Sequence, residues 1–129
     1  MRTKTIELLS IMVFISAFSF VNADVTSDLI AVYQSQGAKT ASAKNGARLW
    51  TKDFNGRTCT TCHSQSVKNQ GKHQKTGKLI KPMAPSVNPQ RLTKAKKVKK
   101  WLLRNCKWTL KRECTAQEKS DILLCLSQQ

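Results

Sequence analysis

Apolar residues recur at helical spacing in several segments of the chain. These segments are 26–36, 41–51, 94–105 and a last one that begins at residue 115. Within each, apolar side chains return every three or four positions, which is the period of an amphipathic α-helix. Thr93 is the expected cap of the third helix, and Thr115 with Glu118 forms a Thr-x-x-Glu capping box at the start of the last. No segment shows the alternation of a strand, so the pattern predicts an all-α fold of short helices.

A long polar segment separates the second helix from the third. Residues 64–89 contain glycines and prolines at close intervals, at positions 71, 77, 82, 85 and 89. Such punctuation predicts a loop rather than a helix or a strand. Because loops of this length in small domains usually serve a function, we expect this one to enclose something.

The first twenty-three residues have the pattern of a secretory signal peptide. Arg2 and Lys4 supply a positive start, an apolar run covers residues 8–21, and Val21-Asn22-Ala23 resembles a cleavage site. We expect cleavage after Ala23, export to the periplasm and one domain over 24–129. A retained membrane anchor is the alternative, although the run is short for a spanning helix.

The chain is strongly basic. Removing residues 1–23 takes away two positive residues and one negative, which lowers the formal net charge from +16 to +15. Aromatic residues do not alternate with the basic runs as they do on nucleic-acid platforms, so no nucleic-acid partner is expected. The charge is typical of a surface that attracts an acidic protein, or of a solvated face.

The pentapeptide CTTCH, residues 59–63, carries the clearest chemistry. A structural zinc site would need a second ligand pair at zinc-finger spacing, and Cys106 and Cys114 have no neighbouring histidine. A thioredoxin-like Cys-x-x-Cys would follow a strand, and no strand is predicted here. Covalent haem fits the motif, since Cys59 and Cys62 would form the two thioethers and His63 would be the proximal iron ligand. The sequence therefore predicts one haem c with its iron.

The arrangement around this motif resembles a class I cytochrome c. In that family an N-terminal helix with Gly-x-x-x-aromatic, matched here by Gly46 and Trp50, packs against a C-terminal helix, matched by 116–127. The resemblance implies short helices and a long loop around one covalent haem.

Three residues are candidates for the distal iron ligand. Met83 lies in a Pro-Met-Ala-Pro loop and offers a thioether that favours ferrous iron. His73 would make a bis-imidazole haem, but its polar surroundings are typical of a surface histidine. Asn105 offers a weaker amide oxygen, and an asparagine at a helix end is often a C-cap. The chemistry of the residues leaves these alternatives open.

Five short motifs resemble the sphaeroides haem protein group, which are small class I cytochromes that bind oxygen. They are Thr76-Gly-Lys, Pro82-Met-Ala-Pro-Ser86, Trp101-Leu-Leu-Arg-Asn-Cys106, Arg112-Glu-Cys-Thr115 and Glu118-Lys-Ser-Asp-Ile-Leu123. The resemblance implies that Asn105 is the distal ligand of ferric iron and leaves on reduction, so that the ferrous haem binds O2, NO or CO. It also implies a disulfide between Cys106 and Cys114.

The expected function is that of a monohaem c-type cytochrome in electron transfer rather than that of an enzyme. The resemblance implies a multihaem cytochrome c and a membrane b-type cytochrome as partners. A conventional carrier with His63 and Met83 as ligands, or an enzyme that converts oxygen or nitric oxide, are the alternatives. We expect a monomer, with Cys125 either a buried thiol or the site of a disulfide-linked dimer.

Overall fold

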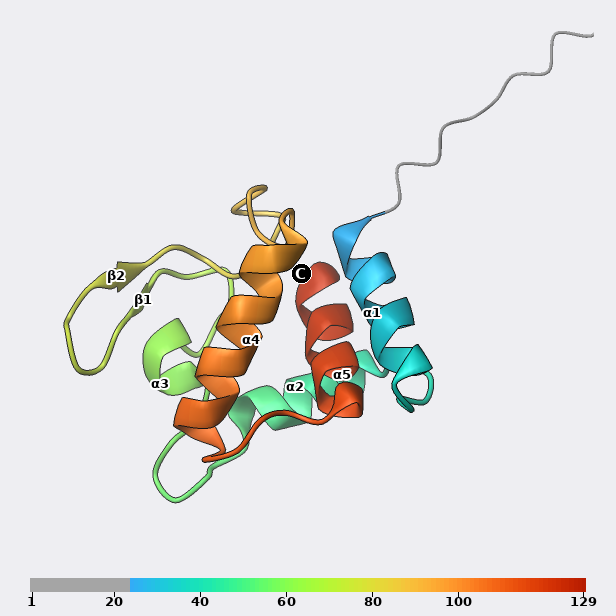
Figure 1. The fold of residues 1–129 in the computed structure, drawn as a ribbon. Coiled ribbons are helices and arrows are strands. Elements are labelled where there is room, and N and C mark those ends of the chain that lie inside the picture. The colour runs from blue at the N-terminus through green and yellow to red at the C-terminus, as the bar shows by residue number, and fades with distance from the viewer. Residues whose placement is uncertain (1–23) are drawn as a thin grey trace, which may run out of the picture.

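The computed structural model describes residues 24–129, and the predicted signal peptide lies outside this range. The chain forms five helices and one two-stranded sheet (Figure 1). In chain order they are α1 (Val25–Ser35), α2 (Ala43–Thr51), α3 (Thr60–His63), β1 (Gly71–Lys72), β2 (Leu79–Ile80), α4 (Ala95–Thr109) and α5 (Ala116–Ser127). Within residues 24–129, none of the helices has the length and apolar composition needed to cross a bilayer.

The four predicted helices are confirmed as α1, α2, α4 and α5, and the capping box is present at the start of α5. The Thr115 side chain accepts from the backbone N–H of Glu118, and the Glu118 carboxylate accepts from that of Thr115 at 2.8 Å. The prediction of Thr93 as the cap of α4 is wrong, because Lys94 holds that position and the Thr93 hydroxyl donates to the carbonyl of Gln90 instead.

Two other details of the prediction are wrong. A short antiparallel hairpin, β1–β2, interrupts the predicted loop, pairing Gly71 with Ile80 and Lys72 with Leu79. Helix α4 also runs one turn beyond residue 105. Strands of two residues are too short to show alternation, which explains why the sequence pattern did not reveal them.

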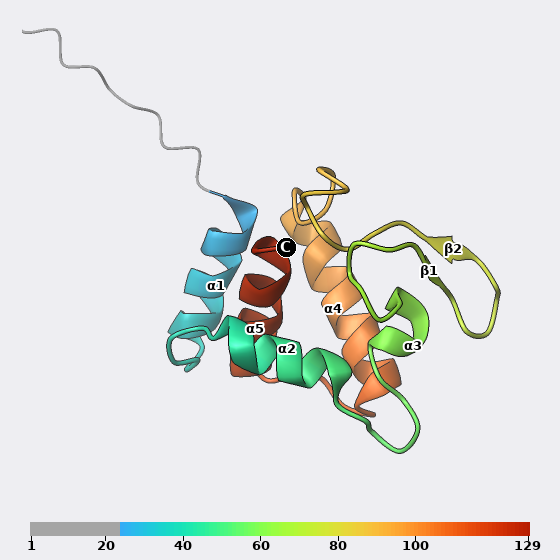
Figure 2. The same cartoon turned by 180° about the vertical axis from the view of Figure 1, so that it is seen from behind.

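Helix α5 is the centre of the packing, with α1 along one side and α2 across it (Figures 1 and 2). One buried cluster surrounds Trp50 on α2 and includes Cys106, Ile122 and Leu126. The other joins Leu29 and Tyr33 of α1 to Leu123 of α5. Burying these apolar faces favours the folded state by about 25 cal/mol per Å² of apolar area. The first cluster adjoins the segment that carries the CTTCH motif, because half-buried Cys59 packs against it.

Candidate haem site

The CTTCH motif forms a single helical turn, α3. Cys59 is its N-cap residue, and Cys62 and His63 lie three and four positions later. Residues at this spacing share one side of a helix, so the three side chains project in similar directions. Thr58 and Thr61 fix the turn, since the backbone N–H of each donates to the hydroxyl of the other at 3.1 Å. The local sequence thus presents two thiols and an imidazole together.

Both cysteines of the motif are half-buried and lie outside any disulfide. Burial raises the pKa of the Cys59 thiol to about 11, and the neighbouring Cys62 contributes in the same direction. The sulfur of Cys62 accepts a hydrogen bond from the backbone N–H of Gln74 at 3.4 Å. Neither residue forms a disulfide, so both remain available for thioether bonds.

The imidazole of His63 is held neutral. Burial lowers its pKa to about 4, and the positive charge of Arg91 adds to the effect. Its ring lies against the indole of Trp50, with the centroids 5.3 Å apart. The Nδ1 atom is buried and has no hydrogen-bond partner within residues 24–129. A neutral imidazole is the form that binds a metal ion, so His63 has the state that a proximal ligand needs.

The hairpin packs closely on α3 through Gly71. A Cβ atom at this position would lie 2.1 Å from the carbonyl oxygen of Cys62 and 2.9 Å from the Cα of His63. Only glycine permits this approach, because both neighbours are backbone atoms. In the sequence Gly71 indicates only a loop, and nothing in its local sequence distinguishes it from Gly77.

The loop that carries Met83 is tied to the segment directly after His63. The backbone N–H groups of Met83 and Ala84 both donate to the carbonyl of Val67, at 2.8 and 3.0 Å. Arg91 also holds this loop, since its Nε donates to the carbonyl of Pro82 at 2.8 Å. The Met83 side chain packs against the cluster around Trp50. Met83 and His63 therefore belong to one connected part of the structure.

Asn105 comes from a different element. It is half-buried within α4, and the helix continues to Thr109, so the alternative of a C-cap is wrong. The next residue, Cys106, forms a buried disulfide with Cys114, which confirms the predicted pairing. The bridge joins the end of α4 to the segment before α5, so the backbone on the C-terminal side of Asn105 is held firmly.

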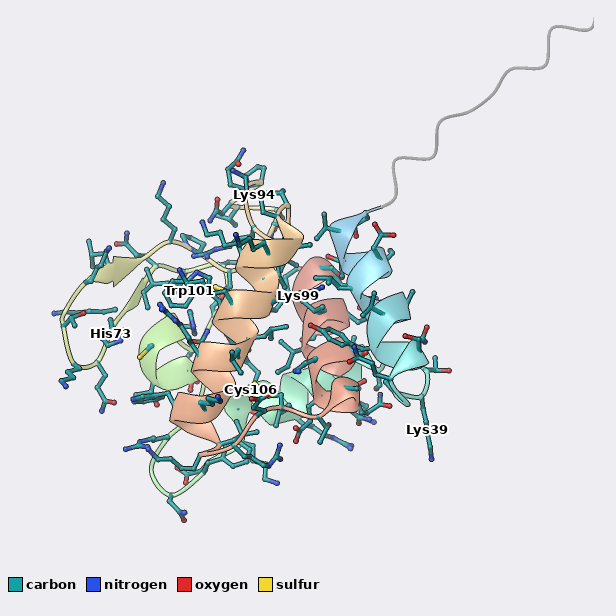
Figure 3. The ribbon with its side chains drawn as sticks, in the orientation of Figure 1. Lys39, His73, Lys94, Lys99, Trp101 and Cys106 are labelled. Carbon is teal, nitrogen blue, oxygen red and sulfur yellow. A yellow bond between two sulfur atoms is a disulfide. The ribbon has the colours of Figure 1, made fainter. Side chains whose placement is uncertain are left out.

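His73, the third candidate ligand, lies at the surface, and several other residues lie there or on the edge of the core. His73 is exposed on the hairpin, where its Nδ1 accepts from the backbone N–H of Thr76 at 3.1 Å. Trp101 is 44% exposed on the side of α4 nearer α3, as Figure 3 shows. Arg57 stacks over Trp108 at 5.0 Å, a contact that the sequence did not reveal. Cys125 is a half-buried free thiol, and burial raises its pKa.

These observations fit a covalent haem at α3. Two free cysteines, a neutral imidazole and half-buried apolar side chains lie together, which are the groups that a c-type haem requires. The orphaned Nδ1 of His63 and Nε1 of Trp50 are buried polar atoms that the described residues leave without partners. Such atoms are rare in proteins and call for an explanation.

Comparisons with known proteins agree with this chemistry. The family described as Domain of unknown function (DUF1924) matches residues 36–126. The cytochrome c-type protein SHP of Cereibacter sphaeroides is 40% identical over 108 residues, which cover 80% of this chain and 83% of that protein. Cytochrome c'' of Methylophilus methylotrophus is 37% identical over 65 residues, 50% of this chain and 45% of that protein.

Solved structures of the same two proteins share the fold. Oxidised SHP, described as an oxygen-binding cytochrome c, has a TM-score of 0.74 at 39% identity, covering 81% of this chain and 96% of that one. Oxidised cytochrome c'' has a TM-score of 0.71 at 26% identity, covering 80% and 93%. The chain therefore belongs to the DUF1924 family and to the all-α, haem c-containing cytochromes represented by SHP.

Proposed function

We propose that this protein is a periplasmic monohaem cytochrome that transfers electrons and binds O2, NO or CO when reduced. Haem c supplies one-electron chemistry and, where the ferrous iron has an open position, affinity for diatomic gases. The protein determines how the cofactor is held and what reaches it. Cys59 and Cys62 would hold it covalently, and His63 would be the proximal ligand.

Asn105 is the proposed distal ligand of the ferric state. The observation that supports this choice is that the two candidates, Met83 and Asn105, lie on different parts of the structure. Met83 is hydrogen-bonded to the segment that follows His63, whereas Asn105 lies on α4. Asn105 would therefore come to the iron from an element separate from α3, which carries His63.

The chemistry of an amide ligand supports a redox-dependent bond. A neutral amide oxygen is a hard donor that prefers ferric iron, so Asn105 would hold oxidised iron more strongly than reduced iron. A thioether would remain bound to ferrous iron and would block the open position. The buried Cys106–Cys114 bridge would limit how far Asn105 moves when it is released. Asn105 would thus be kept near the iron in both oxidation states.

Paired substitutions test the assignment. Asn105→Ala should change the optical and electron paramagnetic resonance spectra of the ferric protein, because it removes the proposed ligand. Met83→Leu conserves size and the packing of Met83 against the core, and under the proposal it should leave both spectra as they are. The opposite result would establish the conventional carrier with His63 and Met83 as ligands.

Export and partners form the remaining part of the proposal. Residues 1–23 would be cleaved after Ala23, and the electron partners would be a multihaem cytochrome c and a membrane b-type cytochrome. Cell fractionation followed by haem staining and N-terminal sequencing should find the mature chain in the periplasm, beginning at Asp24. Recovery with the membranes and an intact N-terminus would instead support a retained anchor.

A further inference from the structure

The positive charge of the protein is concentrated in one continuous half of the chain. Residues 54–112 contain sixteen lysines and arginines and no aspartate or glutamate. The rest of the described chain has five basic residues and all six acidic ones, so it contributes a net charge of −1. The acidic residues are Asp24, Asp28, Asp53, Glu113, Glu118 and Asp121. The positive charge is therefore distributed unevenly along the chain rather than uniformly.

The hairpin lies at the end of the molecule opposite α1, which carries Asp28 and has Asp24 as its N-cap (Figures 1 and 2). In Figures 1 and 2, β1 and β2 lie at one end of the molecule and α1 lies at the other. Lys72, Lys75, Lys78 and Lys81 are all exposed on it. Two ion pairs occur within residues 24–129, Lys107–Glu113 and Arg112–Glu118, and neither uses a hairpin lysine. The charges of the four hairpin lysines therefore face the solvent.

An exposed apolar side chain accompanies these lysines. Leu79 is 62% exposed, the largest exposure among the large hydrophobic residues of the described chain. Together with the four lysines it makes up what we call the basic hairpin face. The backbone presents this face in a defined shape, because the N–H of His73 donates to the carbonyl of Lys78 and the N–H of Gly77 to that of His73, both at 2.8 Å.

The basic hairpin face adjoins the proposed haem-attachment site. Gly71 lies against the backbone of Cys62, and the backbone N–H of Gln74 donates to the Cys62 sulfur at 3.4 Å. A protein bound to the hairpin would therefore come close to the thioether side of the cofactor. Electron transfer needs the partner to come close to the cofactor. A charged loop that served only to increase solubility could lie anywhere on the surface.

We infer that the basic hairpin face is the docking surface for an acidic electron-transfer protein, which exchanges one electron with the haem from the Cys62 side. The inference rests on the proposed function and names the surface that serves it. Exposed lysines on the same hairpin as an exposed leucine, with Lys72 directly opposite Leu79 across the strands, suit a transient interface in which opposite charges speed association. The transfer forms no bond: the reduced partner loses one electron and ferric iron gains it.

Two variants of equal net charge test the inference. In the first, Lys72, Lys75 and Lys78 are replaced by glutamine. In the control, Lys39, Lys44 and Arg48 are replaced by glutamine. These three are exposed and lie outside the basic half of the chain, and Figure 3 shows Lys39 and His73 at opposite ends of the molecule. The probe is flavodoxin hydroquinone, an acidic one-electron donor, mixed with the ferric protein in a stopped-flow instrument at low ionic strength.

The hairpin variant should lose about tenfold in the second-order rate constant, because electrostatic steering commonly changes on-rates by about 10 to 1,000-fold. The control variant should lose less than about twofold. Raising the salt concentration should remove the difference, since screening shortens the range of these charges. Reduction by neutral lumiflavin hydroquinone should be the same for all three proteins, which shows that the haem itself is unchanged.

Other results would overturn the inference. Equal slowing of both variants would mean that only net charge matters. An unchanged flavodoxin rate, together with loss of binding to phosphatidylglycerol vesicles in the hairpin variant, would make the face a lipid-binding surface instead. Failure of the proposed function can be told apart from failure of this inference. If the wild-type protein has no haem spectrum, the proposed function fails before any partner is added.

Discussion

Replacement of Gly46 by alanine should destabilise the protein, although the same change usually stabilises a helix. Gly46 lies where α2 crosses α5. A Cβ atom there would be 2.0 Å from the carbonyl oxygen of Asp121 and 2.7 Å from the Cβ of Cys125. An ordinary contact begins at 3.4 Å, so the two helices would have to separate by about 1.4 Å.

The size of the effect follows from the two opposing contributions. In an exposed helix, alanine is favoured over glycine by about 1 kcal/mol. Overpacking of a tight contact costs about 1 to 3 kcal/mol, and here the obstructing atoms include backbone that cannot rotate away. Because the nearest of these atoms are backbone, the upper end of that range applies, about 3 kcal/mol, and subtracting the helix-propensity gain of about 1 kcal/mol leaves a net loss of about 2 kcal/mol in the free energy of unfolding.

Urea unfolding of the ferric protein, followed by far-ultraviolet circular dichroism, measures this difference. Asn45→Ala is the control, because Asn45 is exposed on the same helix and should gain a few tenths of a kcal/mol from helix propensity. The reasoning would be refuted if Gly46→Ala were as stable as the wild type or more stable.

Two further changes test other parts of the structure. Cys106 and Cys114 are eight positions apart, and replacing both by serine removes the cross-link, so the free energy of unfolding should fall by about 2 to 3 kcal/mol. An unchanged urea midpoint would contradict a structural role for the bridge. Hydrogen bonds from Arg112 hold the pKa of Glu118 below its usual 4.5, so the stability that the carboxylate contributes is complete above about pH 4.5 and is lost as the pH falls through the lowered value. Glu118→Gln should therefore flatten the loss of stability on acidification below pH 4.5, and an identical pH profile for the two proteins would exclude this contribution.

The sequence predicted those features of the fold that depend on neighbouring residues. The capping box at Thr115 and the apolar periodicity of the helices are local, and the structure has both. The end of α4 was not predictable, because Lys107 and Trp108 extend no clear apolar stripe. The extra turn lies beside the buried disulfide of Cys106, and the backbone N–H of Leu110 donates to the Cys106 carbonyl at 2.8 Å.

The features of the candidate site also include local ones, which the sequence predicts, and contacts between distant residues, which it does not. CTTCH specifies the two thiols and the imidazole by their spacing, so the sequence alone was enough to recognise them. The contact between Trp50 and His63 and the approach of Gly71 to Cys62 join residues that are distant in sequence. No local pattern records such contacts. For the same reason, spacing left the choice between Met83 and Asn105 open, whereas the backbone bonds of Met83 to Val67 bear directly on it.

An anaerobic optical titration of the wild-type protein with carbon monoxide tests the central claim most directly. Spectra of the ferric and ferrous protein would be recorded with and without the gas. We expect a six-coordinate ferric protein that becomes high-spin on reduction, with an open position that carbon monoxide fills readily. A ferrous spectrum that stays low-spin and does not respond to carbon monoxide would contradict the proposed function.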